Sequence, residues 1–367
     1  MKILALPNAL KGSLSARQAL QIFVDTLAPR HQVRAFSISD GGDGFLDFFK
    51  QIDPHAKTLF ITAKNAFNEN KRAPFLLLAD GKTAVIETAR ICGLGKTPKN
   101  KLDPLGATSY GVGQVLSAAV KHGAKIVYVG LGGVACNDGG AGLAVACGAR
   151  LTDSKNKTIA LGAKGLLKLS QLDLTPIQKN FSKIKIIAVT DVSNPLLGPA
   201  GSASVFGPQK GASPRQVKIL ERALTRWERL LKKATGKTTA RLPGAGAAGA
   251  IATGLYAGFN AQLCPGTTLW TKQLSIKKHL RWADLIITTE GKLDKQTFYG
   301  KAPGTVLKLS REYRKPVLFI CGQTDSKALY RQPLRPDCLA VLTDFASNTE
   351  DAKKQAAKYL RRICRSL

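Results

Sequence analysis

Three loops carry the residues best suited to chemistry, and each follows a short apolar run typical of a strand. The first, residues 130–142, reads GLGGVACNDGGAG. Glycines allow the backbone to approach an anion closely, and N–H groups at the start of a following helix can hold phosphate oxygens. Asn137 and Asp138 add an amide and a carboxylate that could bind a metal or a hydroxyl group. The pattern predicts a phosphate-binding loop, with a tight strand–helix turn as the alternative.

Carboxylates stand in the other two loops. Glu290 and Asp294 are four residues apart, so at the start of a helix both would face one side, as Mg²⁺ binding or general-base catalysis requires. Asp191 follows the apolar run 184–189, where a strand would end, and open α/β sheets bind their ligands at that edge. The structural alternatives are a helix cap or an ion pair for Asp294 and an Asx turn for Asp191.

Other kinds of site find little support in the sequence. Gly-Lys-Thr occurs at 95–97 and 236–238, but the glycine that opens a Walker A loop is missing at positions 90 and 231. The dinucleotide fingerprint is matched only weakly, at 130–135 and at 244–249. The four histidines lie away from the acidic loops, and the seven cysteines show no CxxC spacing. A histidine-based site and a zinc site are therefore not expected.

The elements that must position these loops follow a strand–loop–helix order. Apolar runs at 2–6, 33–38, 126–130, 184–189 and 284–289 predict buried parallel strands. Between residues 56 and 90 the pattern changes to alternating strands with short turns, which indicates a mixed sheet. We therefore expect an α/β protein with two domains. Residues 1–65 plus 283–367 would form a parallel-sheet, flavodoxin/Rossmann-like domain, interrupted by an inserted mixed-sheet α/β domain at 66–282.

Composition limits the class of protein. The chain has 367 residues, of which 44% are hydrophobic, so general disorder is excluded. Its 55 Lys and Arg against 24 Asp and Glu give a net charge of +31, which implies affinity for anions. The first apolar run is too short for a signal peptide, and the uncharged stretch 242–271 is rich in Gly and Ala and broken by proline. A cytoplasmic protein without a membrane span is expected.

The positive charge raises a rival interpretation, a protein that binds nucleic acid or another polyanion. Basic residues gather in the helical stretch 213–237 and near the C-terminus, at Lys353, Lys354, Lys358, Arg361, Arg362 and Arg365. No aromatic platform or RNA-binding signature lies among them, so solvated helix faces are the favoured interpretation. An NAD-type dehydrogenase is the enzymatic rival.

Several of these loops together resemble the bacterial type-I glycerate kinase family. The shared segments are collinear and cover nearly the whole chain. They include Lys11-Gly12-Ser13, residues 40–44 (DGGDG), Asn137 to Gly142 (NDGGAG), Asp191-x-x-Asn194-Pro195-Leu196, residues 206–211 (FGPQKG), residues 244–249 (GAGAAG), and Glu290-Gly291 through Asp294 to Gly300-Lys301.

The resemblance implies a kinase that uses ATP and Mg²⁺ to phosphorylate D-glycerate, with 2-phosphoglycerate favoured over the 3-phosphate. It implies a site in the cleft between two α/β domains. Asp191 would accept the substrate proton, and Lys11 would hold the carboxylate or the moving phosphoryl group. Substrate and phosphate contacts would come from Ser13, Asp40, Gly132, Gly133, Asn137, Gly139, Gly140 and Lys301, and Mg²⁺ contacts from Asp138, Glu290 and Asp294. A related small hydroxy acid is the alternative substrate, and a homodimer is the candidate assembly.

The chain departs from the family pattern at three places. Asn8-Ala9-Leu10 stands where Asp-Ser-Phe is common, Val134-Ala135-Cys136 stands where Ser-Ala-Thr is usual, and Asp43 replaces Glu. The first two changes remove a carboxylate and hydroxyl groups. Because losing a hydroxyl group from a polar site can change substrate discrimination strongly, we expect catalysis to be kept and substrate preference to be altered.

Overall fold

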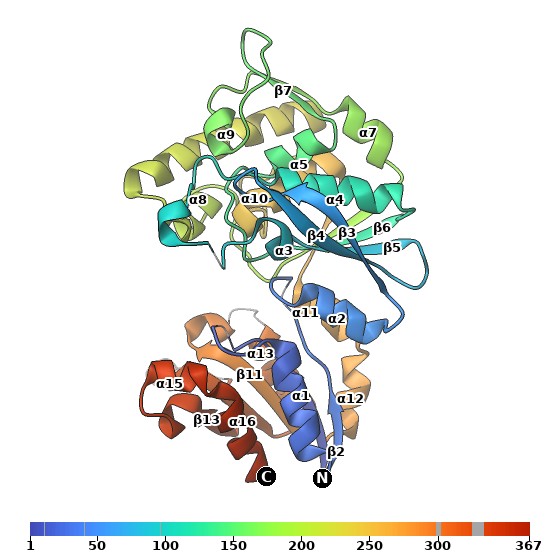
Figure 1. The fold of residues 1–367 in the computed structure, drawn as a ribbon, viewed down its shortest axis with the longest axis vertical. Helices are drawn as coiled ribbons and strands as arrows, with labels where there is room; N and C mark the ends of the chain where they lie inside the picture. Colours follow the sequence, from blue (N-terminus) through green and yellow to red (C-terminus); the bar gives the residue numbers. More distant parts are fainter. Residues whose placement is uncertain (11, 40, 96, 299–301, 325–333) are drawn as a thin grey trace. The chain divides into compact units, whose positions relative to one another are not determined.

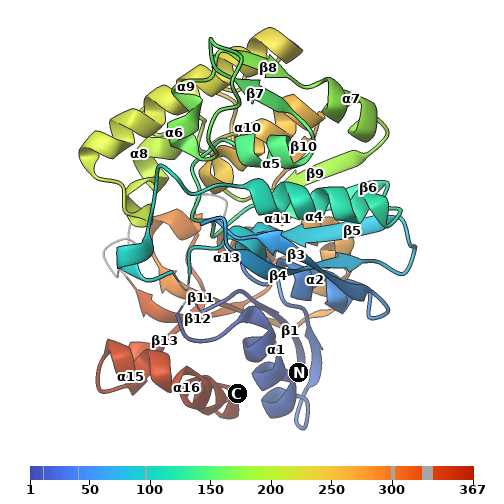
Figure 2. The ribbon, with the colours of Figure 1, turned by 45° about the horizontal axis from the view of Figure 1, so that its top comes forward.

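The computed structural model describes residues 1–367 except residues 11, 40, 96, 299–301 and 325–333. The described residues group into two compact units (Figures 1 and 2). Unit 1 comprises residues 1–40, 47–52 and 266–367, and unit 2 comprises residues 41–46 and 53–265. Unit 1 is therefore discontinuous in sequence, and nearly all of unit 2 is one continuous segment.

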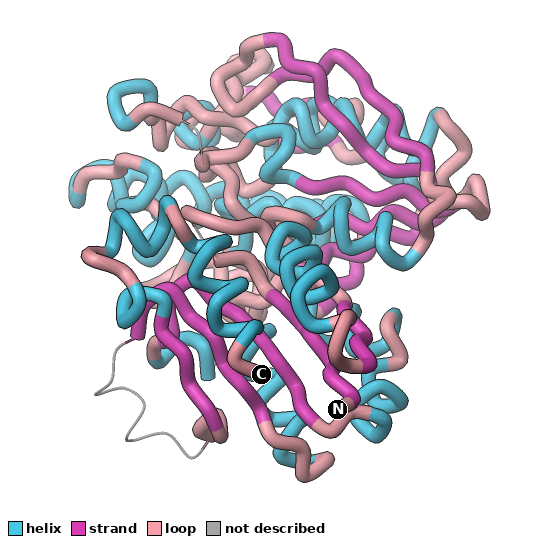
Figure 3. The backbone as a smooth tube through the Cα atoms, turned by 60° about the horizontal axis from the view of Figure 1, so that its bottom comes forward, coloured by secondary structure: helices cyan, strands magenta, loops and turns pink. Residues whose placement is uncertain are grey.

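Unit 1 contains a five-stranded sheet whose strands are all parallel, in the order β13–β12–β11–β1–β2. Figure 3 shows these strands side by side, with helices across them. The strands are β1 (Lys2–Pro7), β2 (Gln32–Ala35), β11 (Leu285–Leu293), β12 (Val317–Thr324) and β13 (Cys338–Val341). In chain order the arrangement is 2-1-3-4-5, which is the flavodoxin-like order.

The central strand β1 is buried on both faces because it is apolar from Ile3 to Leu6. Ile3 and Ala5 on β1 pack with helices α1 (Ala16–Leu27) and α16 (Ala356–Arg365) in one core. Leu4 and Leu6 point to the opposite face and are buried as well. Helices α12 (Ile276–Trp282) and α13 (Ala302–Glu312) contact β1 and β11, respectively. Among the described residues, the other α-helices of this unit are α11 (Gly266–Gln273) and α15 (Thr349–Lys354), while the residues of α2 (Phe45–Ile52) are divided between the two units.

Unit 2 is built on a six-stranded mixed sheet in the order β10–β9–β6–β5–β4–β3. Strands β5, β6, β9 and β10 are parallel, whereas β3 and β4 pair antiparallel, and so do β4 and β5. The strands are β3 (Lys57–Lys64), β4 (Asn70–Leu77), β5 (Thr83–Glu87), β6 (Ile126–Gly130), β9 (Lys185–Val189) and β10 (Gln262–Cys264), with a separate hairpin of β7 (Arg150–Thr152) and β8 (Gln171–Asp173).

The helices of unit 2 pack around this sheet and share one large apolar core with it. They are α3 (Thr88–Cys92), α4 (Tyr110–Lys121), α5 (Ala141–Ala146), α6 (Ala163–Leu166), α7 (Thr175–Phe181), α8 (Ser202–Phe206), α9 (Pro214–Thr235) and α10 (Ala247–Phe259). Helix α9 begins at a capping box formed by Ser213 and Gln216 and buries Trp227 on its inner face. Among the described residues, no helix is both long and apolar enough to span a bilayer.

The predicted α/β class, with a parallel sheet and a separate mixed sheet, is confirmed. The unit limits differ from the expected boundaries at 65/66 and 282/283. Residues 57–64 form β3, which pairs along its whole length with β4 and so lies in unit 2. Residues 266–282 lie in unit 1, because α12 buries Ile276 and Leu280 and contacts β1.

Candidate functional site

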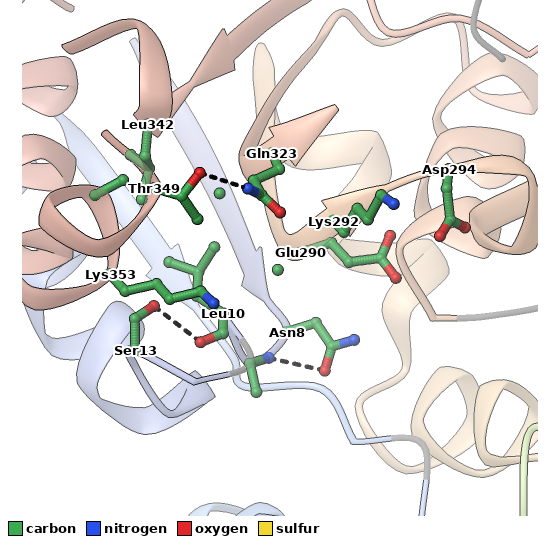
Figure 4. A pocket seen from close by; sticks show the side chains of 14 residues that line it. Asn8, Leu10, Ser13, Glu290, Lys292, Asp294, Gln323, Leu342, Thr349 and Lys353 are labelled. Carbon is green, nitrogen blue, oxygen red and sulfur yellow. Dashed lines mark hydrogen bonds between the residues drawn. The ribbon is translucent and has the colours of Figure 1, made fainter. Parts of the chain in front are cut away.

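A cavity of about 210 Å³ lies in unit 1 at the carboxyl ends of β1, β11 and β12 (Figure 4). In the 2-1-3-4-5 order the strand order reverses between β1 and β11, and open α/β sheets bind ligands at that switch point. The polar and charged residues that line the cavity are Asn8, Ser13, Glu290, Lys292, Asp294, Gln323, Thr349 and Lys353. Segments from both ends of the sequence therefore form one site.

Two of the predicted carboxylates, Glu290 and Asp294, line this cavity together. Glu290 does not sit at a helix start, because β11 continues through Leu293 and pairs there with β12. Asp294 directly precedes the 3-10 helix Lys295–Phe298, and its carbonyl accepts the Thr297 N–H at 3.1 Å. Glu290 is 7% exposed and accepts a hydrogen bond of 2.7 Å from the Thr297 hydroxyl, which in turn accepts the Asp294 N–H at 3.2 Å. Thr297 thus fixes Glu290 relative to the Asp294 backbone.

The chemistry of this donor set fits Mg²⁺. Magnesium prefers oxygen ligands and is usually held by one or two carboxylates together with water and substrate phosphates. Glu290 and Asp294 supply such a pair. Within the described part of the chain, no three His, Cys, Asp or Glu side chains form a full metal-binding cluster.

The first loop, which follows β1, forms another wall of the cavity. The Asn8 side-chain oxygen accepts the Ala9 N–H at 2.9 Å, and its backbone carbonyl accepts the Thr289 hydroxyl at 2.6 Å. Ser13, a predicted contact residue, lines the cavity and donates its hydroxyl to the Leu10 carbonyl at 2.9 Å. Three other predicted residues, Lys11, Asp40 and Lys301, lie outside the described residues.

Four polar residues of the cavity were not singled out as site residues by the sequence analysis: Lys292, Gln323, Thr349 and Lys353. Gln323 is the penultimate residue of β12 and donates from Nε2 to the Thr349 hydroxyl at 2.9 Å. Lys353 belongs to the basic run that was interpreted as a solvated helix face. A signal was available for Gln323, because it comes two residues after the apolar run 317–321, but none distinguished Lys353 from its neighbours.

In unit 2, the predicted residue Asp138 is fully buried and surrounded by donors. Its Oδ2 accepts hydrogen bonds from the Thr108 hydroxyl (3.0 Å), from the N–H and hydroxyl of Ser109 (2.8 and 3.0 Å) and from the Gly142 N–H (3.2 Å). These bonds join the start of α4 to the start of α5, which is a structural role. Metal binding by Asp138 stays a prediction, and it would require some of these donors to be displaced.

Asn137 is also fully buried, and both ends of its amide are used within the protein. Its Nδ2 donates to the Pro104 carbonyl at 3.2 Å, and its Oδ1 accepts from the Lys210 ammonium at 3.0 Å. Lys210 also donates to the Cys136 carbonyl at 2.7 Å. Because Lys210 is only 3% exposed, burial lowers the pKa of its amine. Substrate contact through Asn137 stays a prediction.

The glycines of residues 130–142 permit close packing of the chain. A Cβ atom at Gly132 would lie 2.7 Å from the Gly42 Cα atom, and one at Gly139 would lie 2.5 Å from the Trp227 ring. Gly140 is buried as well, whereas Gly133 is exposed. The part of this loop that a ligand can reach is therefore at Gly132 and Gly133, and their phosphate contacts stay a prediction.

The strand ends of unit 2 carry further acids. Asp191 is half-buried two residues after β9, as its place in the sequence predicts. Glu87, which the sequence analysis missed, ends β5 and is 1% exposed. It accepts hydrogen bonds from the N–H groups of Gly44 and Leu46 and from Arg90. Burial raises the pKa of Glu87, and these donors oppose that shift.

The motif at 244–249 serves close packing. Gly249 has a φ of +62°, and a Cβ atom there would lie 1.9 Å from the Cys136 carbonyl oxygen. Its neighbours Ala248 and Ala250 also have positive φ, of 51° and 66°, which residues other than glycine rarely adopt. The Gly249 carbonyl accepts the Gly139 N–H at 3.1 Å, so this strained turn supports the loop at 130–142.

Known proteins resemble this chain over its whole length. The model of the glycerate kinase family matches residues 3–367. A glycerate kinase of Bacillus subtilis (strain 168) is 34% identical, with 100% of this chain and 97% of the relative covered. A glycerate 2-kinase of Escherichia coli (strain K12) is 35% identical, with 95% and 93% covered. A crystal structure of a candidate glycerate kinase 2 from Salmonella typhimurium LT2 superposes with a TM-score of 0.80 at 34% identity, covering 100% of this chain and 96% of that one.

These matches, together with the two α/β units and the acidic cavity at the switch point, define the class of the protein as a kinase of the α/β type. Within that class, the chain belongs to the glycerate kinase family.

Proposed function

We propose that this kinase transfers the γ-phosphoryl group of ATP to a hydroxyl group of D-glycerate and forms 2-phosphoglycerate. The observation that carries the proposal is the cavity at the switch point of unit 1, where two carboxylates and two lysines meet in a member of this family. The relative named glycerate 2-kinase supports the 2-position. We expect the reaction in the cytoplasm, where ATP is available.

Phosphoryl transfer depends mainly on positioning and on neutralising charge. Mg²⁺, when bound, would neutralise phosphate oxygens, and Glu290 and Asp294 are the residues that would hold it. We propose that Lys11 and Lys301 neutralise further anionic oxygens and that Ser13, Asp40 and the exposed Gly132–Gly133 backbone orient the substrates. The Asp191 carboxylate would accept the proton of the attacking hydroxyl group.

The test is turnover of ATP, Mg²⁺ and D-glycerate by the purified protein. Coupling through enolase detects 2-phosphoglycerate alone, and adding phosphoglycerate mutase also detects the 3-phosphate. We expect signal without the mutase, and we expect it to fall at least about 100-fold in Asp191→Asn, the usual scale for losing a general base. Signal that requires the mutase would overturn the regiochemistry.

A second candidate function is phosphorylation of a related small hydroxy acid. It is favoured by Asn8, which lines the cavity with an amide where the family commonly has a carboxylate. A panel of hydroxy acids measured with the same ATP consumption assay decides between them. A higher kcat/KM for another acid than for D-glycerate would establish the second candidate.

A further inference from the structure

Two adjacent lysines on α15 have different surroundings. The helix begins after Asn348, whose side chain accepts the Asp351 N–H at 2.9 Å. Thr349, Ala352 and Lys353 line the cavity, and their i, i+3, i+4 spacing puts them on one face of the helix. Lys354 instead pairs with Glu350 at 2.8 Å, and both of these side chains are about three-quarters exposed. Both lysines are exposed, but Lys353 lines the cavity, whereas Lys354 is paired with a surface acid.

The position of α15 is fixed by contacts on several sides. The Thr349 hydroxyl accepts Gln323 from the end of β12 at 2.9 Å, and Ala352 is buried in the unit 1 core. Asp351 accepts the Tyr359 hydroxyl at 2.7 Å and the Ser347 N–H at 3.0 Å. Lys353 thus extends from an anchored helix, and Figure 4 shows its side chain reaching toward Leu10 and Ser13. No described residue forms an ion pair with its ammonium group.

The charges around the cavity favour an anion beside Lys353. The described lining residues include the acids Glu290 and Asp294 and the cations Lys292 and Lys353. In Figure 4 the two acids lie on the β11 side, and the Lys353 side chain points toward the loop after β1. Asn8 contributes an uncharged amide to that loop. An ammonium group facing neutral oxygens and amides is complementary to phosphate or carboxylate oxygens.

We propose that Lys353 binds an anionic oxygen group of a substrate in the unit 1 cavity, opposite the Mg²⁺ ligands Glu290 and Asp294. The proposal rests on the proposed kinase function and adds a binding residue to it. The shared chemistry is an oxyanion, which is either a phosphate of ATP or the carboxylate of the hydroxy acid. In both cases Lys353 would act as a point charge that lowers the repulsion between the two anionic substrates.

The test compares Lys353→Met with Lys354→Met, two neighbouring changes that remove the same charge and keep a side chain of similar length. Steady-state KM values for ATP and for the hydroxy acid are measured, and calorimetric titration with ATP and with D-glycerate gives binding directly. We expect Lys353→Met to raise KM and Kd for one of the two ligands roughly tenfold to 100-fold, the scale of a lost hydrogen bond to a charged group. Lys354→Met should stay within about twofold, because exposed ion pairs contribute little.

The outcomes separate the possibilities. A rise confined to ATP assigns the phosphate, and a rise confined to D-glycerate assigns the carboxylate. If Lys353→Met and Lys354→Met change KM and Kd equally, the proposed role of Lys353 is overturned, whichever substrate the wild-type protein phosphorylates. If the wild-type protein binds these ligands but phosphorylates no hydroxy acid, the proposed function is overturned. The Kd values of the two variants then still test whether Lys353 binds an anionic group. Thermal unfolding of both variants checks that the helix is retained.

Discussion

In both units, parallel strands are followed by loops with acidic residues, but these acids have different surroundings. In unit 1, Glu290 and Asp294 line a cavity. In unit 2, Asp138 and Glu87 are buried and accept backbone N–H groups. The order of the strands accounts for part of this contrast. The order in unit 1 reverses between β1 and β11, which opens a crevice, whereas β5, β6, β9 and β10 follow one another across the sheet of unit 2.

The contrast teaches that an acid after a strand is not by itself a ligand-binding group. What decides is whether the neighbouring loops diverge or fold over the strand ends. Around β6 they fold over, since the Leu131 N–H donates to the Val189 carbonyl and Gly132 touches Gly42. The acids of unit 1 should therefore affect activity, and the buried acids of unit 2 should affect stability.

The largest expected effect is on catalysis, from Glu290→Gln. The amide keeps an oxygen that can accept the Thr297 hydroxyl but loses the charge that would hold Mg²⁺. We expect kcat/KM to fall at least about 100-fold, with a higher Mg²⁺ requirement and little change in thermal unfolding. Titrating Mg²⁺ at saturating ATP measures this. An unchanged Mg²⁺ dependence would contradict the assignment of the cavity as the metal site.

The matching change in unit 2, Asp138→Asn, should act on folding. One of its oxygens becomes an NH₂ group that cannot accept the surrounding donors, and buried unsatisfied groups cost about 1–3 kcal/mol each. We expect the free energy of unfolding to fall by about 3 kcal/mol or more, measured by urea denaturation. If instead the variant keeps its stability and needs more Mg²⁺, Asp138 binds the metal and the contrast between the units fails.

Lys210→Met tests the buried cation of unit 2. It removes the donor to Cys136 and Asn137, so we expect a loss of about 2–3 kcal/mol at neutral pH. Because the pKa of Lys210 is lowered in the folded state, the unfolded chain binds more protons below pH 10.5, and this group's contribution to stability rises as pH rises toward that value. The difference in unfolding free energy between wild type and variant should therefore grow with pH. A difference that shrinks would contradict the burial effect.

The smallest expected effects come from glycines. Gly132→Ala should cost about 1–3 kcal/mol, because the added methyl group would lie 2.7 Å from the Gly42 Cα atom. Gly258→Ala in α10 is the matched control: nothing lies within 4 Å of its Cβ position, and we expect it to be neutral or to stabilise by up to about 1 kcal/mol. Equal unfolding free energies for the two variants would show that the loop after β6 can move away from Gly42 without cost.

The sequence alone predicts the local features well. Asp191 lies after a strand, as expected, because an apolar run followed by a polar residue depends only on neighbouring positions. The pairing of β3 with β4, which moves residues 57–64 into unit 2, depends on contacts that no local pattern contains. The direction of Asp138 depends on Thr108 and Ser109, about thirty residues away. Lys353 lines a cavity to which Asn8, Leu10 and Ser13, from the opposite end of the sequence, also contribute.

The place of β1 in the centre of the unit 1 sheet has a consequence for biosynthesis. One neighbour of β1 is β2, but the other is β11, with Ile3 opposite Leu285. At roughly 5–20 residues per second, a ribosome needs on the order of 15–55 s between making these two strands. During that interval unit 2 can fold, while one edge of the apolar strand β1 has no partner. Until the last quarter of the nascent chain emerges, one edge of β1 therefore has unpaired backbone N–H and C=O groups that can pair with another chain. Early chaperone contact with residues 2–7 is advantageous for this reason.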